Sequence, residues 1–101
     1  MRFTRIATLA ENEPHAFDLG TSGPAKIIIN NAGSANILMG QDRSDVLAAT
    51  GSQYLTLSPG VMIVFDVSDI VGYVAQRQTL WFNASGGDST LEIAVLDVIG
   101  G

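Results

Sequence analysis

Residue types that commonly carry out catalysis are few and scattered in this chain. His15 is the single histidine, so any Ser-His-Asp arrangement would have to use it, yet it follows Pro14 in a polar segment and no G-x-S-x-G motif is present. This setting predicts a solvent-exposed loop histidine. The absence of cysteine excludes thiol catalysis, disulfides and zinc-thiolate sites. The residues therefore predict a protein that is not an enzyme.

Two aspartate pairs have a spacing that a calcium loop could use. They are Asp42 with Asp45 and Asp66 with Asp69. Neither fits the D-x-D-x-D-G pattern, and two carboxylates leave most of the roughly six to eight ligands of calcium unfilled. We expect these aspartates to cap turns instead, with Asp66 also facing outward on its strand as a guard against aggregation. No metal, cofactor or small-molecule ligand is expected.

Glycine-rich and glycosylation patterns also have simple structural explanations. None of the 11 glycines forms G-x-G-x-x-G or a phosphate-binding loop, and Gly86-Gly87 falls between two strand-like segments, where a hairpin needs φ > 0. Asn83-Ala84-Ser85 matches a glycosylation sequon. Because the N-terminal residues lack the apolar run of a secretion signal, we expect this sequon to be incidental.

Trp81 is the residue best suited to form an aromatic platform for a sugar ring. Phe82 follows it directly, and Tyr73 is nearby in the sequence. Neighbouring residues of a strand point to opposite faces, so one of Trp81 and Phe82 must enter the core. Core packing or a subunit contact is favoured over a sugar platform, because large aromatic side chains dominate both cores and interfaces.

Composition narrows the classes of partner. Ten acidic residues against five basic ones give a net charge of −5, which repels nucleic acid. Four of the bases, Arg2, Arg5, Lys26 and Arg43, lie in the first half of the chain, so a local basic spot on a partner-facing edge remains open. No stretch reaches the roughly 18 apolar residues of a membrane span, so no membrane partner is expected.

Elements of strand character recur about every ten residues between Gly, Asn, Asp, Ser and Pro, a pattern typical of sandwiches and barrels. At 101 residues the chain fits one domain, residues 1–101. The sequence predicts an all-β, antiparallel β-sandwich, jelly-roll-like, with seven or eight strands. The candidate strands are residues 2–9, 16–19, 26–30, 36–39, 53–57, 61–67, 79–84 and 91–98, while residues 70–75 are either strand or loop.

Turns and faces follow from the same pattern. Residues 26–30 and 36–39 are expected to form a hairpin, and turns are expected at Ser58-Pro59-Gly60 and at residues 85–88. Residues 44–49 predict one helical turn capped by Ser44, too short to affect the architecture. The expected inward residues are Leu55, Leu57, Val61, Ile63, Phe65, Val67, Leu91, Ile93 and Val95.

Apolar residues also occupy positions that should face solvent. They are Ile28, Leu38, Met62, Val64, Trp81, Leu96 and Val98. Loops or the N-terminal segment could cover them, or they could lie in a subunit interface. The interface is favoured because charged residues make up only 15% of the chain, against about 25% in a typical soluble domain.

From Lys26 onward, the order of these segments resembles that of small β-sandwich proteins of tailed-bacteriophage virions. The segments are KIIINNAGSANILMG, YLTLSPG, VMIVFDVSD, LWFNASGG and STLEIAVLDV. The resemblance covers about three quarters of the chain and is a pattern of strands and turns, without a catalytic signature. Residues 70–78 (IVGYVAQRQ) depart from the usual form and look like an extra loop or strand before the aromatic strand.

The resemblance implies a capsid decoration or cement protein, or a component of a head fibre or tail. Proteins of this kind act by binding, often as trimers, and need no cofactor. The implied partners are the major capsid protein and sister copies in a homotrimer, and the implied location is the capsid surface of a virion made in a bacterial cytoplasm. A fibre- or tail-associated module that binds a carbohydrate or receptor is the alternative, and a small jelly-roll hydrolase is third.

Residues 1–9 are the expected partner-binding segment. Their apolar and polar residues do not separate cleanly onto two faces, which suits an edge strand or an N-terminal arm. We expect Arg2 and Arg5 to meet acidic groups of a neighbour, and Phe3 and Ile6 to act as apolar anchors. Trp81 completes the set of expected contact residues.

Overall fold

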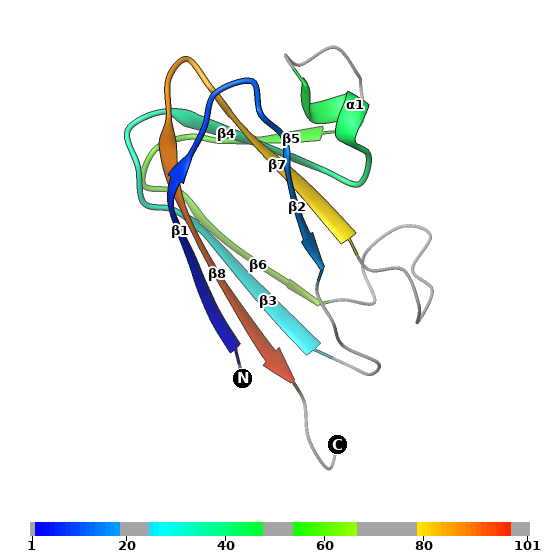
Figure 1. Cartoon of the computed structure of the whole chain (residues 1–101). Helices are drawn as coiled ribbons and strands as arrows, with labels where there is room; N and C mark the ends of the chain where they lie inside the picture. Colours follow the sequence, from blue (N-terminus) through cyan, green and yellow to red (C-terminus); the bar gives the residue numbers. More distant parts are fainter. Residues whose placement is uncertain (1, 19–24, 48–53, 67–78, 98–101) are drawn as a thin grey trace.

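A computed structural model describes residues 2–18, 25–47, 54–66 and 79–97 of the chain. Its strands form two four-stranded antiparallel sheets that lie one above the other in Figure 1. Sheet A has the strand order β1-β8-β3-β6, and sheet B has the order β2-β7-β4-β5. The predicted all-β sandwich is therefore confirmed.

The elements follow the predicted segments with small shifts at their ends. The strands are β1 Arg2–Leu9, β2 His15–Asp18, β3 Ala25–Asn31, β4 Asn36–Gly40, β5 Tyr54–Leu57, β6 Met62–Asp66, β7 Thr79–Ser85 and β8 Ser89–Asp97, and the helix α1 is Arg43–Val46. The predictions for residues 70–75, Val67, Val98 and Tyr73 lie outside the described residues. In the described ranges, no helix has the length and apolar character needed to cross a membrane.

The hydrophobic core lies where the inner faces of the two sheets meet. Alternation along β8 directs Leu91, Ile93 and Val95 inward, as predicted, and all three are at most 2% exposed. Leu55 also lies on the inward side, paired with the core residue Met39, but it is 57% exposed because β5 is an edge strand of sheet B. The core cluster is Leu9, Phe17, Ile27, Ile29, Ile37, Met39, Leu57, Leu80, Phe82, Ala84, Leu91, Ile93 and Val95, with Ile6, Ile63 and Phe65 packed against it.

Most connections cross from one sheet to the other, so the predicted hairpin over residues 26–39 is wrong. β3 pairs with β6 and β8 in sheet A, whereas β4 pairs with β5 and β7 in sheet B. Gly86 (φ 83°) and Gly87 (φ 130°) do have the predicted positive φ, but β7 and β8 also lie in different sheets. Each sheet has one apolar face that must be covered. Connections that carry the chain from one sheet to the other bring the two apolar faces together, so both become buried.

Asn31, fully buried at the end of β3, ties the two sheets together. Its Nδ2 donates to the carbonyl oxygens of Ala35 and Leu57, both at 2.8 Å. Its Oδ1 accepts from the Gly33 N–H at 3.1 Å and lies 2.8 Å from the Ser89 hydroxyl, which is also 2.9 Å from the Ala35 carbonyl. These bonds fix the chain where it leaves sheet A, since each buried polar group there has a partner.

Gly33 allows the β3–β4 connection to lie directly against β8. A Cβ at this position would be 2.8 Å from Ser89 Cα and would overlap the Ser89 hydroxyl and the Thr90 backbone nitrogen. The neighbouring Ala32 N–H donates to the Thr90 carbonyl at 2.9 Å. Only glycine fits this approach without moving the backbone.

A β-bulge explains why the two faces of β1 do not separate cleanly in the sequence. Ile6 pairs with Leu91 and Leu9 pairs with Ser89, so β1 uses one more residue than β8 between these two pairs. The extra residue brings Leu9 to the same side as Ile6, where Leu9 is 1% exposed. Phe3 and Arg5, before the bulge, lie on the other face of sheet A.

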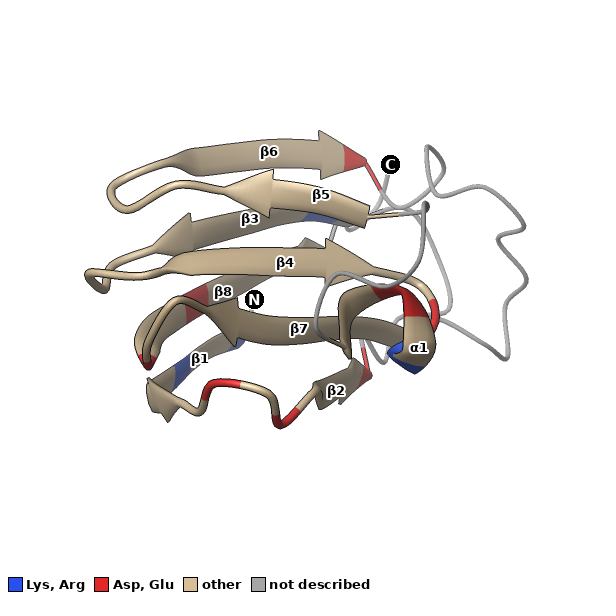
Figure 2. Cartoon of the chain, turned by 90° about the horizontal axis from the view of Figure 1, so that it is seen from above, with Lys and Arg blue, Asp and Glu red and all other residues tan. Residues whose placement is uncertain are grey.

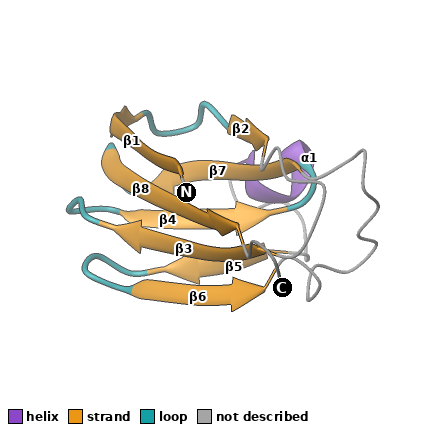
Figure 3. Cartoon of the chain, turned by 90° about the horizontal axis from the view of Figure 1, so that it is seen from below, coloured by secondary structure: helices purple, strands orange, loops and turns teal. Residues whose placement is uncertain are grey.

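The helix α1 covers part of the outer face of sheet B, contrary to the expectation that it has no effect on the architecture. Figure 3 shows it at the end of β4 and beside the start of β7. Val46 is fully buried, and Leu38 beneath it is only 4% exposed. Ser44 lies inside the helix and so is not its N-cap; Asp42 holds that position, without a side-chain capping bond.

The sequon residue Asn83 is also buried beneath α1. Its Nδ2 donates to the Val46 carbonyl at 2.8 Å, and the residue is fully buried. Its Oδ1 has no hydrogen-bond partner among the described residues. Because the amide nitrogen that would carry a glycan faces the protein interior, the folded chain cannot be modified there.

Glu11 joins the β1–β2 connection to the β7–β8 turn. Its Oε2 accepts from the N–H groups of Gly86 (3.0 Å) and Gly87 (3.1 Å), and its own N–H donates to Asp88 Oδ1 at 2.9 Å. The two glycines with positive φ aim consecutive N–H groups at the carboxylate, which is the geometry of an anion-binding nest.

Replacing Glu11 with alanine is expected to lower the free energy of unfolding by about 1 kcal/mol, since charge-assisted hydrogen bonds at an exposed site contribute modestly. Urea unfolding measures this loss. The matched control is Glu13→Ala, which removes the same charge from an exposed residue of the same connection. Equal stability of the two variants would contradict a role for the nest.

Candidate docking face

The outer face of sheet A carries an apolar row across all four strands. The register aligns Phe3 with Ala94, Ala94 with Ile28, and Ile28 with Val64. Phe3 is 75% exposed and Val64 is 54% exposed, and Met62 on β6 is 61% exposed. We call these five residues, Phe3, Ile28, Met62, Val64 and Ala94, the docking face.

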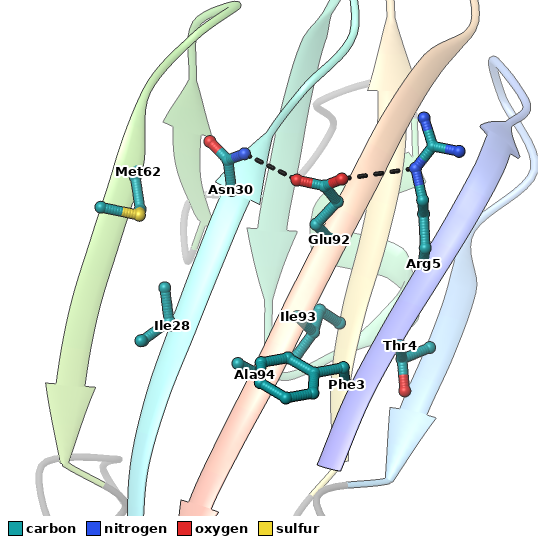
Figure 4. Close-up of a pocket in the computed structure, with 9 residues that line it drawn as sticks. All are labelled: Phe3, Thr4, Arg5, Ile28, Asn30, Met62, Glu92, Ile93 and Ala94. Carbon is teal, nitrogen blue, oxygen red and sulfur yellow. Dashed lines mark hydrogen bonds and ion pairs between the residues drawn. The ribbon is translucent and has the colours of Figure 1, made fainter. Parts of the chain in front are cut away.

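Ala94 forms the floor of a shallow hollow of about 510 Å³ in this face. Its short side chain stands between the larger side chains of Phe3 on β1 and Ile28 on β3. Figure 4 shows the Phe3 ring directed across β8 toward Ala94, with Ile28 and Met62 on the opposite side. A hollow with apolar sides and a small floor can receive an apolar side chain of a partner.

A polar row borders the hollow on one side. Glu92 accepts from Asn30 Nδ2 at 2.9 Å through one carboxylate oxygen, and its other oxygen lies 3.3 Å from Arg5 Nε. The Arg5–Glu92 pair is largely exposed, so it contributes little stability. Its effect is to hold the three polar groups in place along the margin of the docking face (Figure 4).

A second ion pair lies at the other end of the same face. Lys26 Nζ is 3.1 Å from Asp66 Oδ1. Asp66 thus faces outward on its strand, as predicted. The two pairs contribute two positive and two negative charges, so the described residues give the outer face of sheet A no net charge, in a chain whose net charge is −5.

Acidic residues lie mainly outside this face. Figure 2 shows them in the connection between β1 and β2 and around α1. A neutral apolar surface has a low desolvation cost compared with a charged one, and it does not repel a second acidic protein. The outer face of sheet A is therefore the surface of the described chain best suited to bury against another protein.

Groups suited to catalysis or metal binding do not gather elsewhere in the described ranges. No three His, Cys, Asp or Glu side chains there come close enough to hold a metal ion. His15 is exposed, as predicted, but it begins β2 and does not lie in a loop. The docking face itself has the apolar and uncharged character that suits recognition by burial.

The predicted contact residues separate into four places. Phe3 and Arg5 come together on the outer face of sheet A. Ile6 lies partly buried against the core, so it is not the exposed anchor that the sequence suggested, while Arg2 is exposed at the start of β1. Trp81 lies on sheet B, away from the docking face.

Residues 2–9 form a paired strand rather than a detached arm. β1 pairs with β8 from Arg2 to Leu9 and lies at the edge of sheet A, in agreement with the edge-strand alternative.

Glu92, Asn30 and Ala94 were not identified from the sequence as contact residues. The two-residue periodicity of residues 91–98 places Glu92 and Ala94 outward, but it does not reveal that β8 lies between β1 and β3. Among the apolar residues predicted to face outward, Leu38 is covered by α1, whereas Met62 and Val64 remain uncovered in the described chain. Leu38 is thus covered by the chain itself, through a helix and not through the loops or N-terminal segment that were expected, whereas an interface over Met62 and Val64 stays a prediction.

Comparison of the chain with protein-family models, with curated proteins and with solved structures yields no match.

Proposed function

We propose that the chain is a non-enzymatic virion structural protein, a capsid decoration protein that binds the major capsid protein through the docking face and stabilises the shell. The observation that carries this proposal is the row of Phe3, Ala94, Ile28 and Val64 on a neutral sheet face. Interfaces place such apolar and aromatic anchors at their centre and polar groups at their margin.

The strand order supports a jelly roll as the subclass of the fold. Sheets of order β1-β8-β3-β6 and β2-β7-β4-β5 place the first strand beside the last, and they put consecutive strands in opposite sheets except for β4 and β5. Two Greek-key units of this kind build the eight-stranded jelly rolls that occur in viral capsid and lectin domains. Fold alone does not assign function, so the topology is secondary to the docking face.

Repetition over a shell makes a modest interface effective. Copies bound to neighbouring subunits all reinforce the same shell, and a linked set of weak contacts gains avidity without any new contact. The open edge of β1, with Arg2 exposed at its start, offers a sister copy a place to add a strand. A homotrimer assembled in this way would present three docking faces at once.

The decisive experiment determines where the chain is found in particles of the phage that encodes it. Quantitative mass spectrometry of purified particles is expected to find on the order of hundreds of copies, and cryo-electron microscopy to place them with the symmetry of the head. A handful of copies on the tail or at one vertex would overturn the decoration role in favour of a fibre component. Absence from particles would overturn both.

A further inference from the structure

Trp81 lies on the outer face of sheet B and is partly exposed in the described part of the chain. Its two cross-strand neighbours are Ala16 on β2 and Gly40 on β4, which have the smallest side chains available. Phe82, the next residue, is fully buried in the core. Phe82 therefore points into the core and Trp81 points outward. The residues paired with Trp81 on the two adjacent strands are both small, and its indole is partly exposed.

Polar groups surround this indole. Ala16, Gln41, Asp42, Thr79 and Trp81 line a depression of about 520 Å³. Asp42 is exposed, and its carboxylate does not cap α1, although it occupies the N-cap position. The depression thus combines one aromatic ring with a carboxylate, an amide and a hydroxyl from two strand ends.

We propose that this depression is a binding subsite for a neutral pyranose ring of a glycan. The C–H face of a pyranose is apolar and stacks on an indole, while its hydroxyl groups need donors and acceptors at the ring edge. The Asp42 carboxylate supplies acceptors, and the Thr79 hydroxyl can donate as well as accept. The depression falls within the roughly 300–1,000 Å³ of small-molecule sites and is large enough for one ring.

Charge selects among sugars at this subsite. Asp42 lies in the lining, and the chain has a net charge of −5. A carboxylated sugar such as a sialic acid would be repelled, whereas a neutral hexose or N-acetylhexosamine would not. Selectivity for neutral rings is thus part of the proposal.

This subsite goes beyond the decoration role and is independent of it. The docking face belongs to sheet A and Trp81 to sheet B, so the two sites lie on opposite outer faces of the sandwich. A copy held to a shell through sheet A would present Trp81 outward. Loss of one activity can therefore be measured while the other is retained.

The test exploits Trp81 as the only tryptophan of the chain. Its fluorescence and its indole N–H signal in an NMR spectrum of the full chain report on this site alone. Titration with methyl glycosides of glucose, galactose, mannose and N-acetylglucosamine is expected to give a saturable change with at least one of them, at a Kd on the order of 1–10 mM. No saturable change with any of the four up to about 100 mM would overturn the proposal.

Variants separate a true subsite from a general effect on the fold. Trp81→Ala is expected to abolish the glycoside-induced NMR shifts, and Asp42→Ala, which keeps the fluorophore, to weaken binding at least about fivefold. Phe3→Ala, on the other sheet, is the matched control and should bind the glycoside as the parent does. Unchanged binding by Asp42→Ala, or tighter binding of methyl sialoside than of every neutral glycoside, would contradict the assignment.

Discussion

Substitution of Asn31 by aspartate is expected to lower the free energy of unfolding by about 3–5 kcal/mol, a large part of the total stability of a domain of this size. The change replaces Nδ2, which donates to the Ala35 and Leu57 carbonyls, with an oxygen that faces both of them. Two donor bonds become two repulsive contacts around a fully buried charge.

Asn36→Asp is the control for this prediction. It makes the same chemical change at an exposed position only five residues along the chain, so its effect should stay within about 0.5 kcal/mol. Urea unfolding followed by circular dichroism measures both variants. Similar midpoints for the two would show that the Asn31 bonds do not hold the sheets together.

A second large effect is expected at the docking face. The double variant Phe3→Asp, Val64→Asp should weaken binding to capsid shells at least about 100-fold, because each carboxylate must be desolvated inside the apolar contact. The two side chains are 75% and 54% exposed in the isolated chain, so the thermal unfolding midpoint should change little.

The control at the docking face is Leu55→Asp. Leu55 is 57% exposed on β5 of sheet B, so this variant has the same kind of change on a surface that the proposal leaves unbound. Co-sedimentation with shells purified without the chain measures occupancy for each variant. If Leu55→Asp loses as much binding as the double variant, sheet A is not the contact surface.

The glycoside titration and the shell-binding assay are informative together. The docking-face variants should retain the Trp81 response to sugars, and Trp81→Ala should retain shell binding, because the two sites belong to different sheets. Loss of both activities in one variant would indicate a damaged fold, which the unfolding curves reveal directly.

Strand positions were predictable because they depend on local alternation. In β8, apolar residues two apart predicted Leu91, Ile93 and Val95 as inward, and all three are buried. Turn residues were predictable for a similar reason, since Gly60, Gly86 and Gly87 supply positive φ that other residues adopt only at a cost. Both signals lie within a few residues of each other in the chain.

Sheet membership was not predictable from the same signals. A strand has the same alternation whether its neighbour comes next in the sequence or from the far end, so β3 and β4 suggested a hairpin although they belong to opposite sheets. The face on which Leu9 lies was not predictable either. It depends on the extra residue of the β1 bulge, and only the pairing of β1 with β8 shows where that residue lies.

Local sequence thus determined which residues form strands, where the chain turns, and that one of Trp81 and Phe82 must be buried. Tertiary pairing alone decided that Phe82 enters the core, that Leu38 is covered by α1, and that Phe3, Ala94, Ile28 and Val64 form one row. The physical reason is that alternation assigns two faces to each strand, while long-range hydrogen bonding and burial decide which strands become neighbours and which face is covered.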